Sequence, residues 1–274
     1  MKFLTVLMLV LYYRNWMGNN PLREMFPAST WFSWVAGRFA GENLRFVLGV
    51  VLPTIIVLWV SLELTGFFLG FFWLLLSAAI VLYGVDVVDT EIIFDDQALW
   101  LRGLQESDEV TVLQQIHVNF SRDVVYSVFQ SMMPVLFWFL MFGPAGGLFF
   151  VLCQCYQEQL DENGEELEFL DTLVYWLEWI PSRLTILLFA LLGDFGRTYQ
   201  VFAESVIDTE SPISATLYES AMSAVVGDNS AGNKKVVHKF VSLAEGELEA
   251  LKLLLERSLW GWVGVAALLT ILGL

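Results

Sequence analysis

The chain has 274 residues, of which 57% are hydrophobic and 15% are aromatic, and its formal net charge at pH 7 is −16. Soluble domains average about 45–50% apolar residues even when glycine is counted, so this composition argues against a soluble globular protein. It predicts an integral membrane protein whose first partner is the lipid bilayer. The excess of acids, 30 Asp and Glu against 14 Lys and Arg, argues against a nucleic-acid partner, because phosphate binding needs clustered basic side chains.

Long apolar segments predict an all-α polytopic membrane helix bundle with about five or six transmembrane helices. A helix needs roughly 20 residues to cross a hydrocarbon core of about 30 Å. The six candidate segments lie at residues 2–13, 46–62, 66–84, 132–156, 173–195 and 258–274. The first is short for a full span, and it crosses only if Tyr12, Tyr13 and Trp16 lie in the interface as an aromatic belt.

Two amphipathic stretches, 85–130 and 196–256, interrupt these segments. Their apolar residues recur at helical spacing, which predicts cytoplasmic helical regions. Within the second stretch, the helical patches lie at 198–207, 212–226 and 239–255. Residues 157–172 carry seven acids and no Lys or Arg, and we expect an acidic periplasmic loop there. The whole chain, 1–274, is predicted to form one integral membrane domain.

The distribution of Lys and Arg predicts the orientation, because these residues mark cytoplasmic loops. The loop at 14–45 has four arginines, and both amphipathic stretches contain further Lys and Arg. The connections around Glu63 and at 157–172 have none. This pattern predicts a multi-pass protein with both termini outside and the three larger loops in the cytoplasm.

Three local patterns leave alternatives open. The aromatic residues within 31–39 predict either a short helix on the membrane surface or a connecting helix packed on the bundle. Gly66 and Gly70 form a small-xxx-small pair that favours close packing within the chain, with a homodimer contact as the alternative. The Gly-Pro-Ala-Gly-Gly sequence at 143–147 predicts either a kinked span or two half-helices.

Little in the sequence indicates catalysis. There are two histidines and no Gly-x-Ser-x-Gly motif. Paired carboxylates such as Asp95 and Asp96 occur only in predicted loops. Cys153 and Cys155 lie two positions apart on a predicted helix and face away from each other, so we expect neither a disulfide nor a metal site. His117 lies on an apolar stripe, where packing is the commoner role. We predict no catalytic residue, no metal and no cofactor.

Ionisable residues interrupt the apolar segment 173–195. Glu178 and Arg183 lie five positions apart, with Pro181 between them. Charged side chains are costly in lipid and mark function there by default. Pro181 removes a backbone donor and bars a regular bond to the carbonyl of Leu177, so a kink would bring the two side chains to the same side. The pair would then hold helices together, or bind a carboxylate or phosphate.

Two motifs resemble those of the CobD/CbiB membrane family, which includes cobalamin-pathway amide ligases and the AmpE proteins. The sequence Trp-Ile-Pro-Ser-Arg-Leu-Thr at 179–185 is similar to the family's Tyr-Ile-Pro-Ala-Arg-Leu-Thr signature. The sequence Met-Pro-Val-Leu-Phe-Trp at 133–138 resembles its Ala-Pro-Leu-Phe-Trp segment, and a Gly-rich continuation follows. The candidate residues for ligand binding or for a structural role are Glu178, Trp179, Pro181, Arg183, Pro134 and Trp138.

The acids and histidines of the related ligases are missing from this chain. The ligase pattern has an acid–acid pair before the Ile-Pro-Ala-Arg motif, where this chain has Val174 and Tyr175. It also has Ala-Glu-Asn before the Pro-Leu-Phe-Trp segment, where residues 129–131 read Phe-Gln-Ser. Metal–nucleotide and acid–base chemistry would need such groups. The acid Glu178 directly before the tryptophan is similar to the AmpE proteins instead.

The resemblance therefore implies an AmpE-like regulator or sensor in the inner membrane of Gram-negative bacteria, without ligase chemistry. AmpE proteins are associated with β-lactamase induction in the antibiotic response. Their gene commonly lies beside that of the muropeptide amidase AmpD, which implies a link to cell-wall recycling. The implied partners are a small anionic ligand, or a membrane or cytoplasmic signalling partner in the AmpD pathway. The alternative is an amide ligase of the cobinamide-phosphate synthase (CbiB) type in cobalamin biosynthesis.

Overall fold

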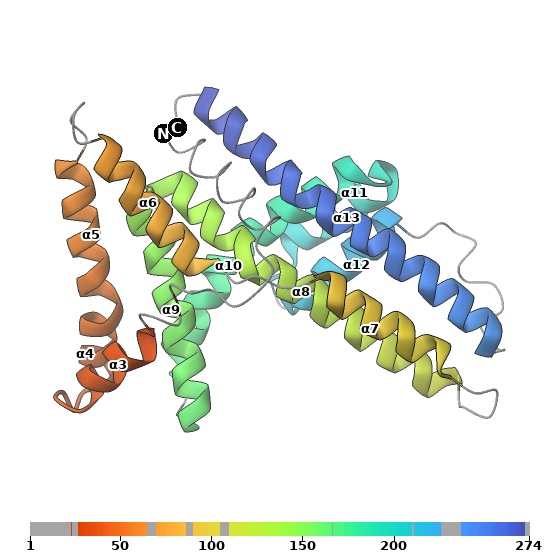
Figure 1. Cartoon of the computed structure of the whole chain (residues 1–274), viewed down its shortest axis with the longest axis horizontal. Coiled ribbons are helices and arrows are strands. Elements are labelled where there is room, and N and C mark those ends of the chain that lie inside the picture. The colour runs from red at the N-terminus through yellow and green to blue at the C-terminus, as the bar shows by residue number, and fades with distance from the viewer. Residues whose placement is uncertain are drawn as a thin grey trace. The chain divides into compact units, whose positions relative to one another are not determined.

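The computed structural model describes residues 23, 27–64, 70–85, 90–104, 110–165, 167–209, 211–225 and 237–271 (Figure 1). Every element among these residues is a helix, so the predicted all-α class is confirmed. The first predicted segment, 2–13, lies outside the described residues, as does Gly66 of the small-residue pair. The helices are α3 (Ala28–Ala36), α4 (Glu42–Phe46), η1 (Val47–Val51), α5 (Leu52–Glu63), α6 (Gly70–Gly84), α7 (Thr90–Arg102), α8 (Val110–Phe142), α9 (Pro144–Asn163), α10 (Glu168–Leu192), α11 (Phe195–Ile207), α12 (Ile213–Val225) and α13 (Val237–Ile271).

Three helical stretches in the described part of the chain are long and apolar enough to cross a membrane, and α6 is a shorter apolar helix. The three stretches are Glu42–Glu63, Val110–Phe142 and Glu168–Leu192. On α5 the outward side chains are themselves apolar, since Ile55, Trp59 and Leu62 are more than half exposed. A helix that is apolar on its exposed face is suited to lipid rather than to water. The chain is thus a membrane protein, and the count of five or six spans stays a prediction.

Two helices are longer than the sequence pattern suggested. The helix α8 runs for 33 residues through both the amphipathic stretch and the next apolar segment, and α13 runs for 35 residues in the same way. Pro134 lies inside α8 without ending it. A proline within a helix removes one donor and clashes with the carbonyl four residues earlier, but the turns on either side keep their own hydrogen bonds, so the helix can continue through it. The change from polar to apolar composition therefore marks no helix end at either place.

The Gly-rich break at 143–147 is a turn between two helices rather than a kink. Gly143 has φ 70° and ψ −156°, a conformation open to glycine and costly for other residues, and Pro144 follows at the start of α9. A Cβ on Gly146 would meet the carbonyl oxygen of Trp138, and a Cβ on Gly147 would lie 3.4 Å from Cβ of Phe139. The missing side chains let α9 pack back along the end of α8.

The predicted acidic loop at 157–172 is shorter than expected. The helix α9 continues to Asn163, and α10 begins at Glu168. Gly164 ends α9 in the left-handed conformation, with φ 69°. This is the ordinary way in which glycine terminates a helix, because it has no Cβ to clash with the carbonyl.

The contacts divide the chain into two compact units. The first comprises Met1–Val87, Ser131–Trp179 and Val263–Leu274, and the second comprises Val88–Gln130 and Ile180–Trp262. Each of the helices α8, α10 and α13 contributes residues to both units. We describe the two units separately.

In the first unit, α3 packs on the bundle through one face. Phe32 is buried and meets the ring of Tyr156 at 5.1 Å between centroids. On the other side Trp31 and Trp34 stack with centroids 5.2 Å apart. Trp31 Nε1 also donates a hydrogen bond of 3.2 Å to the carbonyl of Gly49. Pro53, four residues after Gly49, has no N–H with which to donate to that carbonyl. The interpretation of this segment as a connecting helix packed on the bundle thus describes its buried face.

In the second unit, α11 and α12 pack against each other, following the end of α10 (Figure 1). The predicted patches at 198–207 and 212–226 correspond closely to these helices, and the patch at 239–255 lies within α13. The structure therefore places two short amphipathic helices after the end of a candidate membrane span.

Candidate functional site: the helix ends around α10

The six candidate residues lie on two helices. Pro134 and Trp138 belong to α8, and Glu178, Trp179, Pro181 and Arg183 belong to α10. The first four named in chain order, up to Trp179, lie in the first unit, and Pro181 and Arg183 lie in the second. Glu178 and Arg183 are both buried, with 2% and 5% of their surfaces exposed. That they pair with each other stays a prediction.

Pro181 frees a carbonyl inside α10, and a tryptophan binds it. Pro181 has no N–H to donate to the carbonyl of Leu177, and a membrane interior offers no water to replace that bond. Trp138 Nε1 donates a hydrogen bond of 2.8 Å to this carbonyl oxygen. Trp31 and Gly49 form the same arrangement beside Pro53. Trp138 of the first motif thus binds the main chain of α10 two residues before the second motif begins, and this bond joins α8 to the middle of α10.

Replacing Trp138 by phenylalanine should destabilise the protein by about 1–3 kcal/mol, because the ring remains but the buried carbonyl of Leu177 loses its donor. The measurement is the thermal unfolding temperature of the purified protein in detergent, followed by fluorescence-detected size exclusion. Trp59→Phe is the matched control, since Trp59 is 64% exposed on α5. Equal unfolding temperatures for the two variants would contradict this role of the indole.

Arg183 caps the carboxyl end of α11. Its Nε donates to the carbonyl of Ser205 and its Nη2 donates to the carbonyl of Asp208, both at 2.9 Å. Its Nη1 donates to Ser182 Oγ at 3.2 Å. The last carbonyls of a helix have no partners within the helix and carry the negative end of its dipole, so a buried guanidinium both satisfies and neutralises them. Three specific hydrogen bonds therefore support a structural role for Arg183.

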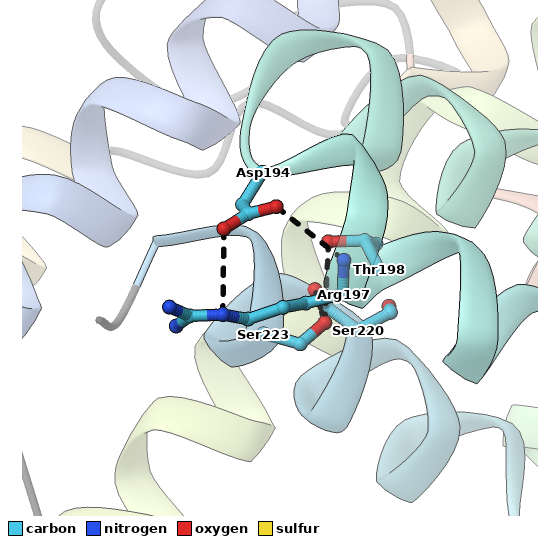
Figure 2. Close-up of polar contacts among 5 residues, drawn as sticks. All are labelled: Asp194, Arg197, Thr198, Ser220 and Ser223. Carbon is cyan, nitrogen blue, oxygen red and sulfur yellow. Dashed lines mark hydrogen bonds and ion pairs between the residues drawn. The ribbon is translucent and has the colours of Figure 1, made fainter. Parts of the chain in front are cut away.

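The turn after α10 is attached to the end of α12. The backbone N–H of Asp194 donates a 3.0 Å hydrogen bond to the carbonyl of Ala224, in the last turn of α12. The Asp194 carboxylate caps the start of α11, since it accepts from the backbone N–H of Arg197 at 3.4 Å. The same carboxylate lies 3.4 Å from Arg197 Nε in a surface ion pair (Figure 2). The chain at this turn thus contacts two helix ends at once.

A pair of hydroxyl groups links α11 to α12 beside this turn. Ser223 Oγ lies 3.2 Å from Thr198 Oγ1 and donates to the carbonyl of Ser220 at 2.9 Å (Figure 2). Thr198 and Ser220 are fully buried. Small hydroxyl-bearing residues let the two helices approach closely while their polar atoms remain satisfied. This contact is a built helix interface.

A polar cavity of about 490 Å³ lies between α7 and α13 in the second unit. Arg102 Nε and Glu245 Oε1 form an ion pair of 2.7 Å at its wall. That hydrogen bond raises the pKa of Arg102. None of the six candidate residues lines the cavity, whose polar lining is Asp95, Arg102, Ser242, Glu245, Glu249 and Lys252.

His117 is a buried packing residue of the second unit with a carboxylate beside it. Its Nε2 lies 3.3 Å from Glu247 Oε2, and its ring meets Phe240 at right angles with centroids 6.0 Å apart. Only 3% of the residue is exposed. Within the described ranges, no three His, Cys, Asp or Glu side chains gather in a way that could hold a metal ion.

Comparison with known proteins supplies the family. The family model described as "Regulatory signalling modulator protein AmpE" matches residues 88–273, about two thirds of the chain. The chain belongs to the AmpE family. The matched range contains both motifs of the resemblance, and it also contains Arg183 and its acceptors on α11. The contacts described above are therefore those of an AmpE-family protein, and this member is a membrane regulatory protein.

A relative of this AmpE protein is described as "Probable cobalamin biosynthesis protein CobD", from Thermococcus kodakarensis. The two are 30% identical over 130 residues, which make up 44% of this chain and 42% of the relative. The match thus covers less than half the length of that protein. No solved structure matches this AmpE protein.

Sequence reasoning found Arg183 but missed what it binds. Its acceptors are the backbone carbonyls of Ser205 and Asp208, and a carbonyl carries no residue-specific signature. The capping role of Asp194 was also missed. The signal for it was present, because a Gly-Asp pair after an apolar helix is typical of one helix ending and another beginning.

Proposed function

We propose that this protein is a multi-pass regulatory protein of the bacterial inner membrane that modulates β-lactamase induction as part of the antibiotic response. Two observations support the proposal. The family model is described as a regulatory signalling modulator, and three described helices are long and apolar enough to cross a membrane. A signal of cell-wall state, read by a membrane protein of this kind, would reach the cytoplasm through its polar helices.

The observation that carries the proposal is the attachment of the two short helices α11 and α12 to one candidate span. Arg183 holds the carboxyl end of α11, and the N–H of Asp194 holds the carboxyl end of α12. Both donors lie in one stretch of twelve residues, 183–194. A rotation or shift of the end of α10 would therefore break or move both contacts together. Helix shifts of this kind are an ordinary route for switching.

The proposed input lies on the same helix. Glu178 and Arg183 bracket Pro181, and a small anionic ligand or a signalling partner that competes for the guanidinium would loosen its hold on α11. Arginine is suited to this because its planar group binds carboxylates and phosphates through two parallel bonds. Trp179 and Pro134 are candidates for the same role. The alternative is that all these residues serve structure alone.

Deleting the gene tests the regulatory role directly. We expect the deletion strain to show a changed level of β-lactamase activity after exposure to an inducing β-lactam, and a plasmid copy of the gene to restore the parental level. The measurement is hydrolysis of a chromogenic cephalosporin in lysates, with growth rate as the control. Unchanged induction in the deletion strain would overturn the proposal.

An amide ligase of the cobalamin pathway is the second candidate, and the relative described as a probable cobalamin biosynthesis protein favours it. The test is complementation of a strain that lacks cobinamide-phosphate synthase, grown under conditions that require cobalamin synthesis. We expect no growth from this gene, because the acids of the ligase motifs are replaced at 129–131 and at Val174 and Tyr175. Growth would establish the ligase instead.

A further inference from the structure

The helix α11 exposes an apolar stripe. Phe195, Tyr199, Phe202 and Val206 recur at spacings of four, three and four residues, which places them on one side of a helix. Phe195, Tyr199 and Val206 are 50%, 48% and 42% exposed. The rings form a continuous row, since Phe195 stacks on Tyr199 at 5.4 Å and Tyr199 meets Phe202 at 6.1 Å between centroids.

The buried side of the same helix is the less apolar one. Thr198 and Ser205 are 0% and 3% exposed, and they face α12 and the Arg183 guanidinium, where Ser205 supplies its backbone carbonyl. In a helix of a water-soluble protein the apolar stripe faces the core and the polar residues face solvent. On α11 the apolar stripe is exposed while Thr198 and Ser205 are buried, so the stripe fits an apolar environment outside the protein.

The stripe begins close to the end of a candidate membrane span. The candidate span α10 ends at Leu192, and α11 begins three residues later at Phe195. Leu191, in the last turn of α10, is another apolar side chain that is largely exposed, at 63%. The bond from Asp194 to Ala224 holds the turn between them. A connection this short keeps the start of α11 at the depth where α10 leaves the hydrocarbon core.

We propose that α11 lies in the membrane–water interface, with its aromatic stripe inserted at the boundary between lipid headgroups and acyl chains. Aromatic residues are enriched at this depth, and amphipathic helices with a polar opposite side bind there through buried apolar area. Gln200 and Glu204 are exposed on the remaining side and face headgroups and water. The helix carries one basic and one acidic residue, Arg197 and Glu204, so insertion depends on apolar contact and needs no anionic lipid.

This arrangement goes beyond the regulatory proposal, since it holds whatever the protein regulates. It also changes the predicted place of residues 196–207, which the amphipathic pattern assigned to a cytoplasmic region. Because α12 contacts Thr198 of the same helix and Arg183 binds the carbonyl of Ser205, a movement of the stripe in the lipid interface would be transmitted to these contacts.

Spin labelling of the full chain in nanodiscs of uncharged phosphatidylcholine tests the proposal. Cys153 and Cys155 are replaced, and a nitroxide is attached in turn at Tyr199→Cys and Val206→Cys. Power-saturation measurements then compare collisions with oxygen, which concentrates in lipid, against those with a water-soluble nickel chelate. We expect oxygen to dominate at both positions.

The matched controls are Gln200→Cys and Glu204→Cys, which lie on the polar exposed side of the same helix. We expect the ratio to reverse there, with the nickel chelate dominating. Equal access of the chelate to all four labels would place the stripe in water and overturn the proposal. Labels at 199 and 206 that neither reagent reaches would place another protein surface on the stripe, and would overturn it as well.

Discussion

Replacing Arg183 by alanine is expected to destabilise the protein by on the order of 4 kcal/mol and to lower its accumulation in the membrane. The side chain is 5% exposed and donates to the carbonyls of Ser205 and Asp208. Each buried carbonyl left without a donor costs roughly 1–3 kcal/mol. Loss of the positive charge at the end of α11 adds up to about 2 kcal/mol in a partly buried setting. Quantitative immunoblotting of membranes and the thermal unfolding temperature measure the two effects.

Two variants control this experiment. Arg183→Lys keeps the charge but lacks the planar fork that reaches two carbonyls at once, so it should fall between the parent and Arg183→Ala. Arg197→Ala removes an arginine whose ion pair with Asp194 is more than a third exposed on both sides. Exposed pairs contribute about 0–1 kcal/mol. If Arg183→Ala were as stable as Arg197→Ala, the capping role would be wrong.

The same variant separates the two roles proposed for Arg183. Poor accumulation together with a low unfolding temperature supports the structural role. Normal accumulation with a changed level of β-lactamase induction would favour ligand binding at the guanidinium. Measuring both quantities on one set of strains distinguishes a failed fold from a failed signal.

Replacing Gly193 by alanine should destabilise the second unit by about 2–4 kcal/mol. A Cβ at this position would lie 2.5 Å from the carbonyl oxygen of Ala224 and 2.7 Å from its Cβ. Overpacking of this kind costs roughly 1–3 kcal/mol. The shift that relieves it would also break the hydrogen bond from Asp194 to the same carbonyl, which adds about 1 kcal/mol. The thermal unfolding temperature is the measurement.

Gly246→Ala is the matched control for the glycine experiment. Gly246 lies inside α13, and a Cβ there would meet nothing within 4 Å. Alanine favours a helix over glycine by about 1 kcal/mol, so this variant should be as stable as the parent or more stable. A Gly193→Ala variant that unfolds at the parental temperature would contradict the close approach of the α10 turn to α12.

Both predictions concern the same mechanical connection. Arg183→Ala releases α11 from α10, and Gly193→Ala pushes the following turn away from α12. If the regulatory signal passes through this connection, each variant should change β-lactamase induction, whereas Gly246→Ala should not. A change in induction that tracks neither variant would place the transmission route elsewhere in the chain.

Composition and periodicity were sufficient to establish the class of the protein. A membrane helix satisfies its own backbone hydrogen bonds, so its presence depends on local apolar composition and little else. The helices α11 and α12 were also predicted close to their observed bounds, because their apolar residues recur at helical spacing. The motifs at 133–138 and 179–185 led to the family that the AmpE model then confirmed.

Helix ends were predicted less well. The sequence pattern divided α8 and α13, because a change from polar to apolar residues looks like a boundary. Each helix continues because helix propagation depends on backbone conformation rather than on the polarity of the outer face. The breaks after α8 and α9 lie at glycines with positive φ, Gly143 and Gly164.

The roles of the candidate residues depended on tertiary contacts. Pro181 indicated a freed carbonyl at Leu177, but the indole that binds this carbonyl belongs to Trp138, which is 39 positions from Leu177. Arg183 indicated a charge within an apolar segment, but its acceptors lie 22 and 25 positions further along the chain. Those acceptors are main-chain oxygens, which every residue possesses, so no sequence pattern distinguishes them. Only the folded path of α11 brings its carboxyl end to the guanidinium.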